Sequence, residues 1–163
     1  MFGVDNSASA LALAADNVDF TGIGNVTLWQ KSVFATDFAE SLLMRLGDDD
    51  HGQQRKLSLL TANPPYIPLN EYLMLPKSVR NYEDERALLS GKDDPFGLLF
   101  YKRIAQLLPE VLDYSLSGPR VAVEVGQGQA EQVRQLFERQ GMARTEAWPD
   151  QWGVQRLVVG WSR

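Results

Sequence analysis

The sequence predicts an α/β fold with a mostly parallel β-sheet, in a single domain over residues 1–163. Segments with the period of a strand alternate with segments with the period of a helix along the whole chain. Val121–Val125 is typical of a continuous apolar strand, and residues 104–112 repeat apolar side chains at the spacing of a buried helix face. The chain has 163 residues, 44% of them hydrophobic, which suffices for one domain with a core.

The first part of the chain predicts two strands, each followed by a helix. Phe2–Asp5 has the pattern of a strand end, and Ser7 or Ser9 can cap the next helix, because an N-cap oxygen accepts a free backbone N–H. Asn25–Gln30 predicts the second strand and residues 36–46 a short amphipathic helix. We expect the inward faces of the two helices to hold Ala8, Leu11, Ala15 and Val18, and Phe38, Leu42 and residues 44–46.

The second part begins with the polar loop Gly47–Gln54 and the apolar strand Leu57–Ala62. A connection rich in proline and charge leads to the longest helix, which we expect to begin at Asp94 and Pro95 and to bend at Pro109. Its predicted buried face is Ile104, Leu107, Leu108, Val111 and Leu112. The remaining predicted elements are strand Val121–Val125, helix Glu131–Arg139, and strands Ala143–Trp148 and Val154–Trp161.

Composition limits the class of function. A net charge of −5 and a pI near 4.9 argue against a large surface for phosphate backbones, so we expect a protein substrate and no nucleic acid. The absence of cysteine excludes disulfides and thiolate zinc sites. No apolar stretch approaches the ~20 residues of a membrane span, and the N-terminus lacks the pattern of a signal peptide. We therefore expect a soluble monomer with no membrane partner.

The segment Asn63-Pro64-Pro65-Tyr66, here called the elbow, follows the predicted strand Leu57–Ala62. Each proline fixes its φ and lacks an N–H, so the backbone carbonyls project as unpaired acceptors. The Asn63 side chain adds another acceptor, and two acceptors in one plane can take both hydrogens of an –NH2 group while Tyr66 lies against the planar substrate. This pattern predicts methylation of an amide or exocyclic amine; a plain Pro-Pro turn after a buried strand is the alternative.

The elbow and its sequel resemble the HemK (PrmC) family of S-adenosylmethionine-dependent methyltransferases. The resemblance runs from Gly3 to about Gly160, and it rests on the elbow followed by Ile67-Pro68, Tyr82-Glu83, Arg86-Ala87-Leu88, Gly91, residues 96–104 and Val123–Gly126. Members of this family methylate the side-chain N5 of a glutamine in peptide-chain release factors. N6-adenine methyltransferases share the tetrapeptide but not this sequel.

The resemblance implies site residues and a methyl donor. Asn63 and Pro64 would be catalytic together with Tyr66, and the whole elbow and Glu83 would bind substrate. S-adenosyl-L-methionine would be the donor, held by Asp5 at its ribose hydroxyls, by Ser32 and Val33 at its adenine, and by Asn63; no metal is implied. Family members usually have an aspartate where Ser32 stands, and a hydroxyl lacks the charge assistance of a carboxylate, so we expect weaker donor affinity.

The resemblance also implies a class I methyltransferase sheet, Rossmann-like, with strand order third, second, first, fourth, fifth, seventh, sixth. In this chain the sheet would lack its first strand and the glycine-rich loop, which should lie upstream of Phe2, so residues 1–163 would form an incomplete catalytic domain. Phe2–Asp5 and Leu57–Ala62 would then either flank a gap or pair directly. From this absence we expect the 163-residue chain alone to be marginally stable, to show no saturable donor binding at micromolar concentration and to be inactive.

Other residues allow more than one interpretation. Glu124 is costly to bury in an apolar strand, so it should lie at a strand end or hydrogen-bond near the site. Glu83 and Arg86 could pair along a helical turn, although the resemblance places Glu83 near the substrate. Residues 126–128 predict a tight turn rather than a phosphate loop, since only two glycines are present. His51, in an aspartate-rich loop, fits neither a calcium nor a zinc pattern.

Two other functions stay open: an N6-adenine methyltransferase acting on DNA or RNA, and a catalytically inactive remnant of a methyltransferase. The acidic charge and the sequel of the elbow weigh against the first. The inserted helix and aspartate-rich loop before Leu57 favour a mitochondrial over a cytoplasmic protein.

Overall fold

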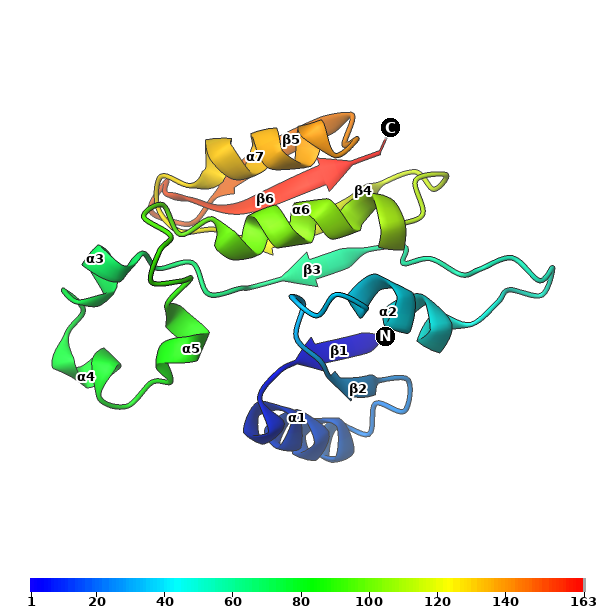
Figure 1. Cartoon of the computed structure of the whole chain (residues 1–163), viewed down its shortest axis with the longest axis horizontal. Helices are drawn as coiled ribbons and strands as arrows, with labels where there is room; N and C mark the ends of the chain where they lie inside the picture. The colour runs from blue at the N-terminus through cyan, green and yellow to red at the C-terminus, as the bar shows by residue number, and fades with distance from the viewer. Residues whose placement is uncertain (163) are drawn as a thin grey trace. The chain divides into compact units, whose positions relative to one another are not determined.

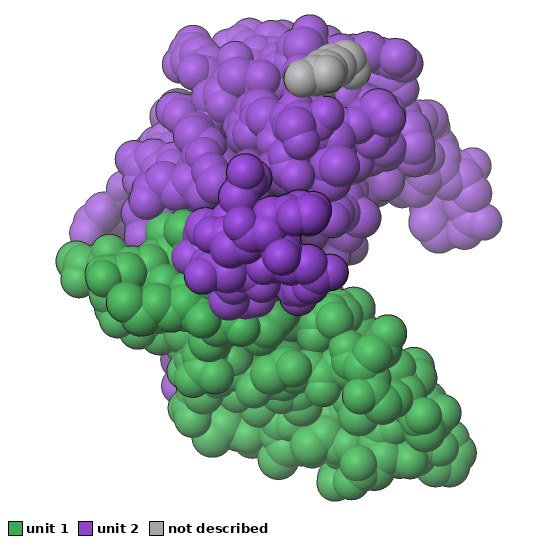
Figure 2. Space-filling view, turned by 90° about the vertical axis from the view of Figure 1, so that its right-hand side faces the viewer, with its two compact units in different colours: residues 1–45 green, residues 46–163 purple. Residues whose placement is uncertain are grey.

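The computed structural model describes residues 1–162. The chain divides into two compact units, residues 1–45 and residues 46–163, which Figure 2 colours separately. The α/β fold expected from the sequence is confirmed, because strands and helices alternate through both units. None of the helices within residues 1–162 is long and apolar enough to span a membrane.

The first unit is a strand–helix–strand motif followed by a helix. Strands β1 (Phe2–Asp5) and β2 (Thr27–Gln30) pair in parallel, joined by α1 (Ala8–Thr21), and α2 (Phe38–Leu46) follows. Ser7 is the N-cap of α1, as predicted, and its side chain accepts the N–H of Ala10 at 3.3 Å.

The small core of the first unit is built around an aromatic stack. The rings of Trp29 and Phe38 lie 5.6 Å apart with an interplanar angle of 23°, and both side chains are buried together with Ala39 and Leu42. Four predicted inward positions are wrong: Ala8, Ala15, Met44 and Arg45 are exposed. Helix geometry explains Met44, which lies six residues from Phe38 and therefore points to another side of α2.

The second unit holds a four-stranded sheet in the order β3-β4-β6-β5 (Figure 1). Its strands are β3 (Leu60–Ala62), β4 (Pro119–Glu124), β5 (Arg144–Pro149) and β6 (Gln155–Trp161). Its helices are α3 (Leu69–Tyr72), α4 (Lys77–Arg80), α5 (Glu85–Leu88), α6 (Leu99–Val111) and α7 (Ala130–Arg139). The strand order within each unit agrees with the order that the resemblance implies.

The prediction of a mostly parallel sheet is confirmed in strand direction with one exception: β3, β4 and β5 of the second unit run the same way, and β6 alone runs opposite to them. Only β3 and β4 pair in parallel there, while β6 lies antiparallel between β4 and β5. The connection from β5 to β6, residues 150–154, is a tight turn closed by the N–H of Gly153 on the Asp150 carbonyl, and such a short link permits only antiparallel pairing. Within residues 1–162, β1 is paired in the first unit with β2, and β3 is paired in the second unit with β4.

The strand predicted over residues 57–62 is shorter than expected. Only Leu60–Ala62 joins the β4 ladder, whereas Leu57 bonds to the end of α6: its N–H donates to the Val111 carbonyl at 2.8 Å. The predicted apolar face of α6 is confirmed. Ile104, Leu107, Leu108 and Val111 are buried, as is Leu112 directly after the helix.

The N-terminus of α6 differs from the prediction. The helix begins at Leu99 rather than at Asp94 and Pro95, because Gly97 has a φ of +67°, which breaks the helical path before it. Asp94 caps the helix from a distance: one carboxylate oxygen accepts the Leu99 N–H at 2.7 Å and the Ser90 hydroxyl at 2.7 Å.

We expect the first unit to open more readily than the sheet of the second. Its sheet has two strands, no residue of α1 is buried, and the side chain of Phe20 is 92% exposed. Two-stranded sheets are marginally stable, and local opening is easiest where few apolar contacts must break. Amide hydrogen exchange measured by NMR should be about a hundredfold faster in β1 and β2 than in β4 and β6. Equal protection in all four strands would contradict this expectation.

Candidate functional site

The elbow begins where β3 ends. Pro64 is buried, which anchors the segment, while Asn63 is exposed. Within residues 1–162, neither the Asn63 side chain nor the Pro64 carbonyl makes a hydrogen bond. Both acceptors are therefore available to a ligand, as the sequence predicts for groups that hold an –NH2.

Tyr66 is the half-buried end of the elbow. Its hydroxyl donates to Oε1 of Glu124 at 3.2 Å. Burial, and then the negative charge of Glu124, raise the pKa of the Tyr66 phenol, so the side chain is a neutral donor at neutral pH. The Tyr66 ring is thus tethered at its tip.

Glu124 fulfils both expectations stated for it. It is the last residue of β4, and its carboxylate is hydrogen-bonded at the elbow. The Glu124 carbonyl accepts the hydroxyl of the buried Tyr101 at 2.8 Å. Tyr101 lies on α6 and has its pKa raised by burial, so it too stays a neutral donor.

The turn after β4 is close to the elbow. Residues 126–129 form the predicted tight turn, in which the Gln129 N–H bonds to the Gly126 carbonyl at 3.2 Å. The Gln129 side chain is buried and donates to the Tyr66 carbonyl at 2.9 Å. Sequence reasoning missed Gln129 and Tyr101, since a single glutamine beside a turn and a tyrosine on an apolar helix face carry no distinctive pattern.

A pocket of about 390 Å³ lies beside Tyr66. Its wall includes Phe96 and the Gly126 turn, and its polar groups include Glu71, Gln132 and Arg156. It is of the size that small ligands or single side chains occupy.

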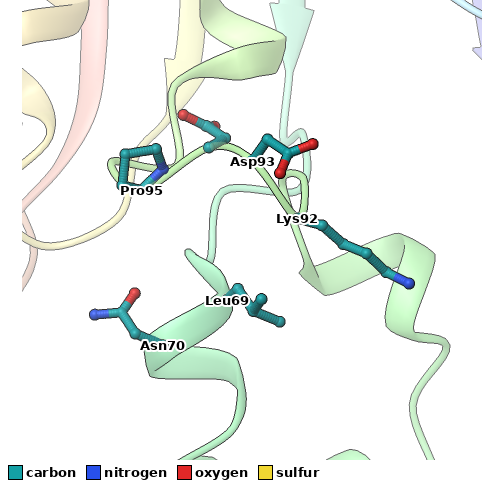
Figure 3. A pocket seen from close by; sticks show the side chains of 6 residues that line it. Leu69, Asn70, Lys92, Asp93 and Pro95 are labelled. Carbon is teal, nitrogen blue, oxygen red and sulfur yellow. The ribbon is translucent and has the colours of Figure 1, made fainter.

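A second hollow, of about 480 Å³, lies between the start of α3 and residues 92–95 (Figure 3). Asp94 lines it, but one Asp94 oxygen already accepts from Ser90 and from Leu99 at the start of α6. The other polar side chains, Asn70, Lys92 and Asp93, are exposed. The polar side chains of this hollow are therefore exposed to solvent or already hydrogen-bonded, and they do not form an organised binding site.

Three of the four predicted donor residues, Asp5, Ser32 and Val33, lie in the first unit, and Asn63 lies in the second. Asp5 ends β1 opposite Gln30, the last residue of β2, and the Lys31 N–H donates to the Asp5 carbonyl at 3.0 Å. Asp5 is exposed, and Ser32 and Val33 follow β2 after Lys31. Because β1 and β2 are parallel, the carboxyl ends of both strands share one edge, where open α/β sheets bind ligands.

Two of these side chains also have local partners. Oδ1 of Asp5 accepts the Ser7 N–H at 2.7 Å, before the first turn of α1. The Ser32 hydroxyl oxygen accepts the Phe34 N–H at 3.2 Å.

The pairing of Glu83 with Arg86 is wrong. Arg86 pairs instead with Asp84, at 2.7 Å, and this hydrogen-bonded ion pair lowers the pKa of Asp84 to about 2. Asp84 is the N-cap of α5 and already accepts the Arg86 N–H at 2.9 Å, which brings the guanidinium onto the same carboxylate. Glu83 is exposed between α4 and α5.

Within residues 1–162 no group of three or more His, Cys, Asp or Glu side chains could hold a metal ion. His51 is exposed, and its backbone N–H donates to Asp49, which also accepts the Gln53 N–H, both at 2.8 Å. The carboxylate of Asp49 thus closes a turn.

Curated relatives of the chain are release factor glutamine methyltransferases. Over 158 residues the chain is 37% identical to the release factor glutamine methyltransferase of Geobacter sulfurreducens, a match that covers 97% of this chain and 48% of that protein. This chain is homologous to the release factor glutamine methyltransferases. The enzyme of the same name from Thermodesulfovibrio yellowstonii is 30% identical over 159 residues, which is 98% of this chain and 50% of that protein. The chain thus spans about half the length of these relatives.

A solved structure agrees with the homology. The protein-(glutamine-N5) methyltransferase (release factor-specific) from Alicyclobacillus acidocaldarius matches with a TM-score of 0.50 and 26% identity, over 99% of this chain and 79% of that chain. No protein-family model matches the sequence. The curated relatives thus show homology to the glutamine methyltransferases, and the solved structure supports the α/β fold.

Proposed function

We propose that this chain carries the substrate-binding elbow of an enzyme that transfers a methyl group from S-adenosyl-L-methionine to N5 of a glutamine side chain in a peptide-chain release factor. The observation that carries the proposal is the pair of unbonded acceptors, Asn63 and the Pro64 carbonyl, at the end of β3. The homology supports the choice of a glutamine amide as the group that they hold.

An amide nitrogen is a weak nucleophile because its lone pair is delocalised into the carbonyl, so positioning must supply much of the catalysis. Asn63 Oδ1 and the Pro64 oxygen each accept one N–H of the glutamine amide, which fixes its plane and the direction of the nitrogen. Such orientation can contribute on the order of 7–11 kcal/mol. Transfer of the methyl carbon would break its bond to the sulfonium sulfur, which would leave as a neutral thioether, and would move the positive charge to N5. The same two oxygens would hold the two N5 protons until one is released to water.

Tyr66 packs over the amide plane in this arrangement. Its hydroxyl is held by Glu124, and its pKa is raised, so the ring presents a neutral face to the substrate. A neutral, tethered ring favours a planar amide and excludes water from one side of it.

The donor, when bound, supplies an electrophilic methyl carbon on a sulfonium. Asp5 fits the ribose hydroxyls, because its carboxylate is exposed at a strand end and has acceptor capacity beyond the Ser7 N–H. Ser32 fits the adenine amino group less well, because its oxygen is neutral and already accepts from Phe34. Val33 would lie against the adenine ring.

The experiment that tests the proposed function uses a hybrid in which this chain replaces the 158 matched residues of the Geobacter sulfurreducens relative. The hybrid is incubated with labelled S-adenosyl-L-methionine, a release factor and adenine-containing DNA. Label on one glutamine of the release factor is expected. Label on DNA would favour the N6-adenine function, and no label from a folded hybrid would favour an inactive remnant.

Replacing Ser32 by aspartate should tighten donor binding by the hybrid. One carboxylate oxygen can accept the Phe34 N–H in place of the hydroxyl, and the other can accept the adenine amino group with charge assistance. We expect the dissociation constant in calorimetric titration to fall roughly tenfold, about 1.4 kcal/mol. Ser58→Asp adds the same charge at an exposed position and serves as the control. Equal affinity of the parent and Ser32→Asp hybrids would refute the assignment of Ser32.

A further inference from the structure

Gln129 joins its own turn to two segments that are distant in sequence, around Tyr66 and around Phe96. Its Nε2 donates to the carbonyls of Tyr66 and Phe96, both at 2.9 Å, and its Oε1 accepts the Gly126 N–H at 2.8 Å. The side chain is only 6% exposed. Both amide hydrogens and the amide oxygen thus have protein partners where water has little access.

The orientation of this amide follows from its partners. A flipped side chain would place Oε1 against two carbonyl oxygens and Nε2 against the Gly126 N–H, which loses all three hydrogen bonds. Gln129 is the N-cap residue of α7, but its side chain makes no capping hydrogen bond to that helix. The side-chain amide of Gln129 therefore bonds to the elbow and to the two segments beside it, at Phe96 and Gly126.

Two glycines make room for this amide. A Cβ built on Gly97 would overlap the Tyr66 carbonyl oxygen and Gln129 Nε2. A Cβ built on Gly126 would stand 2.7 Å from Gln129 Oε1 and 3.0 Å from Cδ2 of Tyr66. The backbones of three segments approach closely around one side chain, and only residues without a Cβ permit it.

We propose that Gln129 is a positioning residue that fixes the shape of the elbow through its hydrogen bond to the Tyr66 carbonyl, while Glu124 accepts the hydrogen bond of the Tyr66 hydroxyl. The tethers act on the two ends of one residue, the backbone and the ring tip. Tyr66 directly follows Pro64-Pro65, so the peptide that Gln129 holds limits how the preceding carbonyls can turn. Only the consequence for methyl transfer rests on the proposed function; the effect on the elbow does not.

Amide hydrogen exchange of the hybrid tests this proposal without a methylation assay. Gln129→Met keeps the length of the side chain but removes its donors and its acceptor. The Gly126 amide, bonded to Gln129, and the Ile67 amide, bonded to the Leu88 carbonyl beside the elbow, should each exchange at least tenfold faster. Amides of the β4–β6 ladder should change less than threefold.

Gln129→Glu separates the acceptor from the donors. A carboxylate can still accept the Gly126 N–H but repels the carbonyls of Tyr66 and Phe96, so Ile67 exchange should rise tenfold while Gly126 stays within threefold of the parent. A residue that only filled space would not give this split. Gln132→Met, at an exposed position of the same pocket, is the matched control and should leave both amides unchanged.

The proposal is overturned if Ile67 exchange stays within twofold of the parent in both Gln129 variants, or if the ladder amides accelerate as much as Ile67 does. If Gln129→Met does not fold, the Gln129→Glu comparison decides alone. A failed methylation assay of the hybrid would count against the proposed function and leave this result standing.

Discussion

We expect methyl transfer to the release factor to fall at least a hundredfold when Asn63 of the hybrid is replaced by alanine. The substitution would remove one of the two acceptors that we propose to orient the amide, so the nitrogen would be free to rotate away from the methyl carbon. Removing a single positioned hydrogen-bond partner of a reacting group typically costs about 10²–10³ in turnover, or roughly 2.7–4 kcal/mol.

Loss of the fold would not explain such a result. Asn63 is exposed and its side chain makes no hydrogen bond within the described residues 1–162, so the free energy of unfolding should change by less than about 0.5 kcal/mol. Radiolabel transfer measures the rate of methylation, calorimetric titration measures the affinity for the donor, and urea unfolding measures the free energy of unfolding. Asn70→Ala, at an exposed position on α3, is the control. Turnover above about a tenth of the parent rate would refute the role of Asn63.

The sequence predicted the free acceptors of the elbow and the place of Glu124, because local rules determine both. Proline fixes its own backbone and removes a donor wherever it stands, so a strand followed by Asn63-Pro64-Pro65 leaves free acceptors in almost any fold. Glu124 could be placed for a similar reason, since a carboxylate in an apolar strand needs either a strand end or a partner. It has both.

The parts that the sequence did not predict depend on contacts between distant segments. The place of β6 between β4 and β5 agrees with the strand order that the resemblance implies, but periodicity alone gives only that strands exist and not which strands meet. Gln129 acquires its partners from two segments 63 and 33 residues away. Arg86 pairs with Asp84 rather than with Glu83 because Asp84 caps α5 and lies beside the Arg86 backbone. Helical spacing alone does not predict this pairing.

The assignments of Asp5, Ser32 and Val33 to the donor stay predictions, as does the mitochondrial location. For the donor residues the structure adds a physical basis, because the parallel pairing of β1 and β2 brings all three to one edge of the sheet. The Ser32→Asp variant addresses the adenine end of that assignment, and the Asn63→Ala variant addresses the elbow.

Gly97→Ala should be among the most destabilising single substitutions in the second unit. Gly97 has a φ of +67°, a conformation that costs a residue with a Cβ about 1–2 kcal/mol. The new methyl group would also overlap the Tyr66 carbonyl oxygen and Gln129 Nε2. One of these atoms belongs to the backbone and the other to a buried amide, so relief requires breaking the bond between them, which leaves buried polar groups unpaired at a further cost of about 1–3 kcal/mol.

Together these terms predict a loss of about 2–5 kcal/mol in the free energy of unfolding, measured by urea denaturation of the hybrid. Gly128→Ala provides a matched control, because Gly128 has a φ of +82° but its Cβ would meet nothing within 4 Å. That variant should lose only the backbone term, about 1–2 kcal/mol. If both variants lost the same free energy of unfolding, the close approach of Gly97 to the elbow would contribute nothing to stability. The backbone around Tyr66 would then accommodate a methyl group without losing its hydrogen bonds.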